Sequence, residues 1–187
     1  MKKQFLITPL LASLFLASCE KEKVEPTPTV ETITASSDAR LYETRVVPAG
    51  STVPFGFVIQ SQNLVNRTWT LLYVAGAPFR YNVEVTDFSD VLPGWVITRR
   101  TPGRKVIFNL KGAPANFTFD SALRDSPIPP RYIIVRDDTI FRIQNLNGLP
   151  LGTRVTALVS SPVPTGWRVV STSADGRTKT LQNTQNF

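Results

Sequence analysis

Short runs of alternating apolar residues recur every 8–12 residues from residue 40 onward, and turn residues separate them. Val, Ile, Thr and Phe are abundant in these runs, and no window shows a sustained helical apolar stripe. Asp137-Asp138, Pro102-Gly103 and Asp175-Gly176 are typical hairpin turns. The pattern predicts an all-β fold with strands at 40–47, 54–60, 68–75, 80–86, 95–100, 104–110, 115–119, 131–136, 139–145, 153–159, 167–172 and 177–182.

The chain also resembles itself at a distance of 72 residues. Residues 69–99 and 141–171 share seven of 31 positions: Gly76/Gly148, Pro78/Pro150, Val83/Val155, Ser89/Ser161, Val91/Val163, Gly94/Gly166 and Trp95/Trp167. Apolar residues keep their alternation in both copies, so the same strand faces are expected to be buried twice. The alignment predicts a duplicated β module with four apolar core anchors, Trp69, Trp95, Phe141 and Trp167.

Each copy holds about six strands, and a Pro-Gly-Trp or Pro-Thr-Gly-Trp step precedes one of them. This arrangement resembles the tandem immunoglobulin-like or fibronectin-type-III-like sandwiches of bacterial secreted proteins. The resemblance implies two small β-sandwich modules, at 38–111 and 112–187. One pseudo-symmetric sandwich of about a dozen strands is the alternative. The Cys…Trp…Cys spacing of antibody domains is absent from the sequence.

The N-terminus has the organisation of a secretion signal. Lys2 and Lys3 precede an apolar stretch, and Leu16-Ala17-Ser18-Cys19 ends it on the only cysteine of the chain. The segment resembles a bacterial lipoprotein signal, which implies removal of residues 1–18 and lipidation of Cys19. An ordinary secretory signal with a chance cysteine is the alternative.

Residues 19–37 carry no aromatic side chain and are rich in Glu, Thr and Pro, so they are expected to form a disordered tether behind the lipid. Fully extended, the 18 residues from 20 to 37 reach at most roughly 60 Å. The charged cluster after Cys19 is similar to the export signals of Bacteroidota surface lipoproteins, although its lysines depart from their acidic pattern. The expected location is extracytoplasmic and lipid-anchored at the outer membrane, on its periplasmic face or at the cell surface.

The residue inventory argues against catalysis. The chain has no histidine, which excludes Ser-His-Asp triads and His-ligated zinc. The closest acidic group is Glu84, Asp87 and Asp90, which could serve a calcium loop or a glycosidase pair but equally forms a solvated strand edge. We expect no catalytic residue, no metal and no cofactor.

The basic residues point to an anionic partner. Removing Lys2 and Lys3 from 21 basic residues leaves 19 against 14 acidic ones, a net charge of +5. Four of these charges, Arg99, Arg100, Arg104 and Lys105, lie on or beside one predicted hairpin. They could bind an anionic glycan, a lipid or an envelope protein. Alternatively, they protect an exposed edge against strand pairing. No nucleic-acid-binding motif is present, so that partner is not expected.

Two functions remain open at this point. The first is a non-catalytic adhesion, scaffold or interaction module of the cell envelope. The second is a glycan-binding surface lipoprotein of a nutrient-uptake system, with Tyr42, Tyr81, Phe88 and Tyr132 as the available aromatic residues. Asp120-Ser121-Ala122 and Asp138-Thr139-Ile140 resemble Bacteroidota O-glycosylation acceptors, which makes Ser121 and Thr139 candidate modification sites.

Overall fold

The computed structural model describes residues 40–185 and contains twelve strands and no helix in that range. The all-β prediction is confirmed, and each predicted strand range overlaps one observed strand. The strands are β1 (Thr44–Pro48), β2 (Phe57–Asn63), β3 (Thr68–Tyr73), β4 (Asn82–Thr86), β5 (Trp95–Thr101), β6 (Arg104–Asn109), β7 (Thr118–Ala122), β8 (Tyr132–Asp137), β9 (Phe141–Asn145), β10 (Arg154–Leu158), β11 (Trp167–Thr172) and β12 (Thr178–Asn183).

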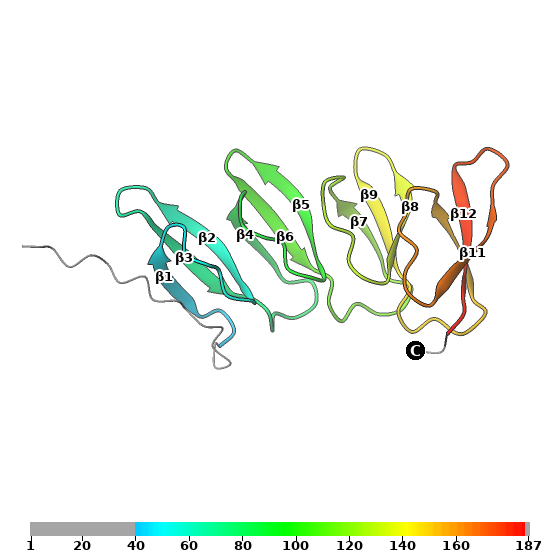
Figure 1. Cartoon of the computed structure of the whole chain (residues 1–187), viewed down its shortest axis with the longest axis horizontal. Coiled ribbons are helices and arrows are strands. Elements are labelled where there is room, and N and C mark those ends of the chain that lie inside the picture. Colours follow the sequence, from blue (N-terminus) through cyan, green and yellow to red (C-terminus); the bar gives the residue numbers. More distant parts are fainter. Residues whose placement is uncertain (1–39, 186–187) are drawn as a thin grey trace, which may run out of the picture.

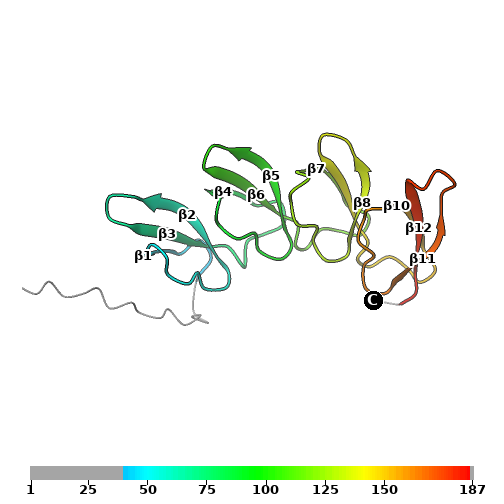
Figure 2. The same cartoon turned by 45° about the horizontal axis from the view of Figure 1, so that its top comes forward.

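The strands form four three-stranded antiparallel sheets with one repeated topology. Their orders are β1-β3-β2, β4-β6-β5, β7-β9-β8 and β10-β12-β11, so the last strand of each unit is central. We refer to them as the first to the fourth sheet. They follow one another in a row (Figure 1), and the order is the same in the turned view (Figure 2).

The repeating unit is therefore half as long as the 72-residue similarity indicates. The central strands begin at residues 68, 104, 141 and 178, so successive units lie 36, 37 and 37 residues apart. The duplicated segment consists of two such units. The connectors between sheets carry the same period: Tyr73–Pro78 reads YVAGAP, Asn109–Pro114 reads NLKGAP and Asn145–Pro150 reads NLNGLP.

Each sheet packs one face on the sheet before it. Between the first two sheets, Val58 and Leu72 meet Val85, Trp95 and Ile107. The same arrangement recurs between the third and fourth sheets, where the core is Ile133, Leu146, Leu149, Ala157, Trp167 and Leu181. The two predicted modules thus each contain two sheets packed face to face.

The packing continues across the predicted module boundary at residues 111–112. Val96 and Leu110 of the second unit share a core with Tyr132, Ile134 and Ile143 of the third. The four sheets consequently form one uninterrupted stack, in which apolar contacts join each sheet to the next. Such an arrangement resembles a repeat array, in which every unit is stabilised mainly by its neighbours.

The Gly-Trp steps have a conformational explanation. The residue before the aromatic side chain that opens the second strand of each unit has positive φ: Gly56 (90°), Gly94 (89°), Arg131 (67°) and Gly166 (83°). Glycine adopts this backbone without strain. At Gly94 a Cβ would also lie 2.6 Å from Lys111 Cγ, so a side chain there would displace the lysine stem. The turn then directs Trp95 into the core, where 1% of its surface is exposed.

Buried asparagines fasten the connectors. Asn109 Nδ2 donates to the carbonyl oxygens of Ala77 (2.7 Å) and Pro78 (3.0 Å), and its Oδ1 accepts the backbone N–H of Lys111 (2.9 Å). Asn145 and Asn183 repeat these bonds one and two units later. Each asparagine therefore links the end of its own sheet to the connector that leads into it.

Serine side chains join neighbouring sheets through a second set of bonds. The backbone N–H groups of three bulge residues donate to serines of the next unit: Ile59 to Ser89 (2.9 Å), Ile97 to Ser126 (2.8 Å) and Ile134 to Ser161 (2.8 Å). Without these serines the buried donors would lack a partner, at a cost of about 1–3 kcal/mol each. We call them the serine links.

The two end faces of the stack differ. The fourth sheet places an arginine where the interior carries apolar residues, whereas the first sheet has an apolar cluster of Val47, Phe57, Ile59 and Leu71 with an arginine over its Phe57 ring. Arg168 follows Trp167 in the position that Val58, Val96 and Ile133 occupy, and it donates to Gln182 Oε1 (3.1 Å). At the other end, the guanidinium of Arg45 lies over the Phe57 ring and pairs with Glu43 (2.7 Å). Polar outer faces are typical of the terminal units of repeat proteins.

Candidate functional site

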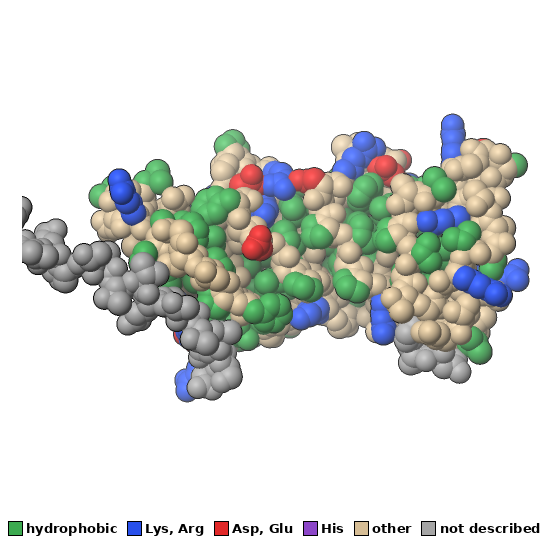
Figure 3. All heavy atoms as spheres, viewed as in Figure 1, with side chains coloured by type: hydrophobic (Ala, Val, Ile, Leu, Met, Phe, Trp, Pro, Cys, Tyr) green, Lys and Arg blue, Asp and Glu red, His purple; other side chains and the backbone are tan. Residues whose placement is uncertain are grey.

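Four hairpins project from the same edge of the stack, namely β2–β3, β5–β6, β8–β9 and β11–β12 (Figure 1). Acidic and basic side chains lie side by side along this edge over the middle sheets (Figure 3). The basic cluster predicted from the sequence belongs to the second hairpin. Its four members have different surroundings.

Two of these four basic side chains form ion pairs with carboxylates of the same chain. Arg100 pairs with Asp87 and, through Nη2, with Asp125 (2.6 Å). Arg104 Nε lies 2.6 Å from Glu84 Oε1. These exposed pairs reduce the positive field of the hairpin, although each contributes little to stability.

Lys105 is not part of the surface. Only 6% of it is exposed, and its Nζ donates to the carbonyl oxygen of Asp87 (2.8 Å). Burial, together with the nearby Arg100 charge, lowers the pKa of the Lys105 ammonium below its usual value. Lys179 takes the equivalent place in the fourth unit and donates to the carbonyl oxygens of Val159 (2.9 Å) and Ser161 (2.5 Å). Both lysines therefore support loops.

Arg99 differs from the other three members. It is exposed and, within residues 40–185, no carboxylate pairs with it. It lines a groove of about 430 Å³ between the second and third sheets, which we call the Arg99 groove. The remaining lining residues are Asn82, Thr98, Val106, Phe108, Phe119 and Ser121.

The walls of the Arg99 groove combine an apolar floor with a polar rim. Phe108 and Phe119 stack with ring centroids 4.7 Å apart and an interplanar angle of 29°. The pairing of β7 with β9 is irregular between Phe119 and Ala122, and this irregularity contains Ser121. Ser121 is exposed there, so a sugar attached to its hydroxyl would fill the groove.

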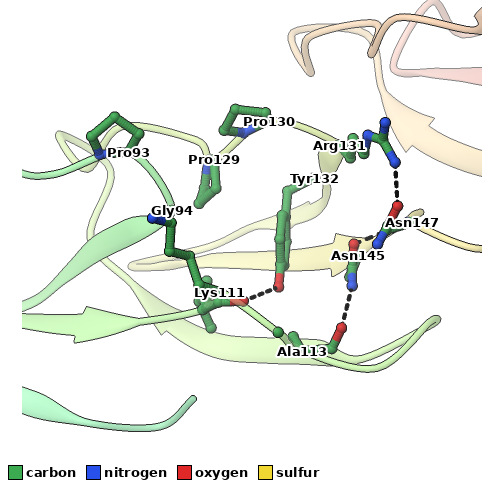
Figure 4. A pocket seen from close by; sticks show the side chains of 12 residues that line it. Pro93, Gly94, Lys111, Ala113, Pro129, Pro130, Arg131, Tyr132, Asn145 and Asn147 are labelled. Atoms are coloured by element: carbon green, nitrogen blue, oxygen red, sulfur yellow. Dashed lines mark hydrogen bonds between the residues drawn. The ribbon is translucent and has the colours of Figure 1, made fainter. Parts of the chain in front are cut away.

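A second hollow lies between the second and third sheets, at the strand ends away from the hairpin turns. Figure 4 shows the residues that line it. It measures about 250 Å³, and Pro93, Pro129 and Leu110 are among its apolar walls. The Tyr132 hydroxyl donates to the Leu110 carbonyl oxygen (3.2 Å), and burial raises the pKa of Tyr132 to about 12. The Arg131 guanidinium at its border bonds to Asn147.

Most of the predicted aromatic residues belong to the core. Trp95 and Trp167 are 1% and 7% exposed, and Trp69 and Phe141 are partly buried. Of the four aromatic residues considered for sugar binding, Tyr132 is buried and Tyr81 packs on Trp95. Tyr42 and Phe88 are exposed, but Tyr42 tilts against Tyr81 and Phe88 against Trp69. They do not form a shared flat surface.

The remaining predicted sites are placed as follows. Glu84 and Asp87 are engaged by arginines, and no group of three or more potential metal ligands occurs in the described residues. Thr139 is exposed in the β8–β9 turn. Cys19, the signal and the whole of the expected tether lie outside the described range. Within that range no helix has the length and hydrophobicity needed to cross a membrane.

Sequence reasoning missed the asparagine and serine links, although their signals are present. The Asn-Leu-x-Gly-x-Pro motif occurs twice at a distance of 36 residues. Ser89, Ser126 and Ser161 each stand six residues before the aromatic residue that opens the second strand of their unit.

No family model, curated protein or solved structure matches this chain.

Proposed function

We propose that this chain is a non-catalytic, lipid-anchored interaction module of the cell envelope, and that it binds an anionic glycan through the Arg99 groove. The observation that carries the proposal is the difference between Arg99 and its neighbours. Arg100 and Arg104 are paired and Lys105 is buried, whereas Arg99 faces a groove with an aromatic floor.

The groove suits a sugar unit that bears a carboxylate, sulfate or phosphate. The apolar face of a sugar ring can pack on Phe108 and Phe119, while Asn82, Thr98 and Ser121 offer hydrogen bonds to hydroxyls. The Arg99 guanidinium supplies five N–H donors for the anionic group. The resemblance of residues 1–19 to a lipoprotein signal supports the envelope location, and the absence of histidine supports the non-catalytic character.

The proposal is tested with the chain lacking residues 1–19, probed on an array of neutral and anionic glycans and envelope lipids at two salt concentrations. We expect binding to anionic glycans that weakens with salt, because charge attraction is screened over about 8 Å at physiological ionic strength. Arg99→Glu should abolish it. Arg177→Glu changes the same charge at the exposed fourth hairpin and should leave it intact.

Other outcomes would contradict the proposal. Equal loss of binding in both variants would indicate a general charge effect instead of a site. Salt-insensitive binding to neutral sugars would favour the nutrient-uptake function. Binding to lipids alone would indicate that Arg99 contacts a membrane surface and not a glycan.

A further inference from the structure

The first hairpin ends in two apolar side chains that are largely exposed in the described part of the chain. Leu64 and Val65, in the turn between β2 and β3, are 77% and 91% exposed. The corresponding turns of the other three hairpins expose no Leu, Val, Ile or aromatic side chain to this extent in the described residues. The four hairpins project from the same edge of the stack (Figure 1), so the first differs from the others in its turn residues and not in its direction.

The backbone holds these side chains outward. Asn63 Oδ1 accepts the N–H groups of Val65 (3.0 Å) and Asn66 (3.1 Å), which closes the turn. Arg67 adopts φ of 49°, and its carbonyl oxygen accepts the N–H of Ala49 (2.7 Å). Hydrogen bonds therefore fix the backbone of the tip, and Leu64, Val65 and the exposed Arg67 lie at its end.

Leucine and valine beside an arginine match the boundary of a bilayer that contains anionic lipids. Apolar side chains enter the region between headgroups and acyl chains, and a basic residue is attracted to the surface charge. The position in the chain agrees with this partner. The first sheet is the one nearest in sequence to the expected tether, whose 18 residues reach at most roughly 60 Å, so the lipid anchor of the proposed function would hold this sheet near the membrane.

We propose that the β2–β3 tip, residues 64–67, inserts into the membrane surface that carries the lipid anchor and so orients the stack on it. The inference rests on the membrane attachment in the proposed function but not on the Arg99 groove. Two side chains bind a bilayer weakly on their own, and the tether compensates by raising their effective concentration at the surface.

The test supplies the tether without using Cys19. The chain from residue 20 carries an N-terminal His tag and is captured on vesicles of phosphatidylethanolamine and phosphatidylglycerol with a chelating lipid. This chain contains no cysteine, so Asn66→Cys provides one attachment point for an environment-sensitive fluorophore. Ala174→Cys at the exposed fourth hairpin tip is the matched control.

We expect a blue shift at position 66 on vesicles and quenching by lipid-borne quenchers, with neither change at position 174. Adding Leu64→Ser and Val65→Ser should lower the inserted fraction about tenfold or more, since most of the apolar area is removed. Capture does not depend on lipidation or on glycan binding, so failure of this test leaves the proposed function untouched.

Three results would overturn the inference. Position 66 could remain in water on tethered vesicles, positions 66 and 174 could respond equally, or the serine variant could behave like the parent. A response at position 66 that requires added envelope proteins and not lipid would assign the tip to a protein partner instead.

Discussion

Tyr132 shows how one residue can fill an equivalent position with different chemistry. It occupies the place of Trp95 and Trp167 in the third unit, but it brings a hydroxyl into the core. The Leu110 carbonyl oxygen accepts a hydrogen bond from that hydroxyl. Arg131 precedes the tyrosine, whereas in the second and fourth units a glycine precedes the tryptophan. The third unit thus tolerates a less regular turn and adds a polar contact between units.

This burial makes a pH-dependent prediction. The pKa of Tyr132 rises from about 10 in the unfolded chain to about 12 in the folded protein. The folded state therefore holds the proton more tightly, and the associated stability is present below pH 10 and lost as the pH rises toward 12. Two pKa units correspond to about 2–3 kcal/mol.

Urea unfolding of the parent and of Tyr132→Phe between pH 8 and 11.5 measures this contribution. The free energy of unfolding of the parent should fall more steeply above pH 10 than that of the variant. Other groups, including the buried Lys105, affect both proteins equally, so the difference isolates Tyr132. Parallel pH profiles would contradict the assignment.

At the scale of the elements, the serine links distinguish a stack from a string of independent sheets. Ser126→Ala should leave the N–H of Ile97 unpaired between the second and third sheets and destabilise the protein by about 1–3 kcal/mol. Native-state hydrogen exchange at the Ile97 amide should become faster.

Ser51→Ala provides the control. Ser51 stands six residues before Phe57, as Ser126 does before Tyr132, but its hydroxyl bonds only to the Pro48 carbonyl oxygen at the exposed end of the stack. We expect its free energy of unfolding to change by less than about 0.5 kcal/mol. Equal effects of the two substitutions would show that the links do not couple the sheets.

The strands were the part of the structure that could best be predicted from the sequence. Alternating apolar residues and turn residues identified all twelve strands, because a residue that faces the core must be apolar whatever lies opposite it. The unit length was harder to see. Tyr73 replaces the asparagine in the first unit, and the hairpin turns range in length from two residues between β5 and β6 to five between β11 and β12. Neighbouring units therefore align poorly, while units two apart align better.

The candidate site could not be predicted in full, because it is formed by contacts between residues of different units that local sequence patterns do not reveal. Arg100 meets Asp87 and Asp125 from two different units, and nothing in the local pattern separates it from Arg99. The groove itself requires knowing that β7 of the third sheet lies against the second sheet and that its pairing is irregular at Ser121. Arg99 was therefore among the predicted residues, but its distinction from the other three was not predictable.

At the scale of the whole molecule, the central claim is that one three-stranded sheet is the structural unit of a continuous stack. The interior sheets present apolar residues on both faces. The outer face of the fourth sheet carries Arg168, and that of the first sheet carries Arg45 over an apolar cluster that includes Phe57 and Leu71. A stack of this kind should tolerate loss of an interior unit, because the sheets on either side have complementary faces.

Deleting residues 110–145 tests this claim most directly. The deletion removes the third sheet and joins Asn109 to Leu146. Leu146 occupies in its unit the position that Leu110 occupies after Asn109, so the connector sequence is preserved. Val96 would then face Trp167. We predict a folded all-β protein with cooperative unfolding, and a maximum dimension in solution scattering about 10 Å shorter than that of the parent. Deleting only residues 110–127 interrupts a unit and should prevent folding. A 36-residue deletion that fails to fold, or that behaves no better than the 18-residue deletion, would contradict the account.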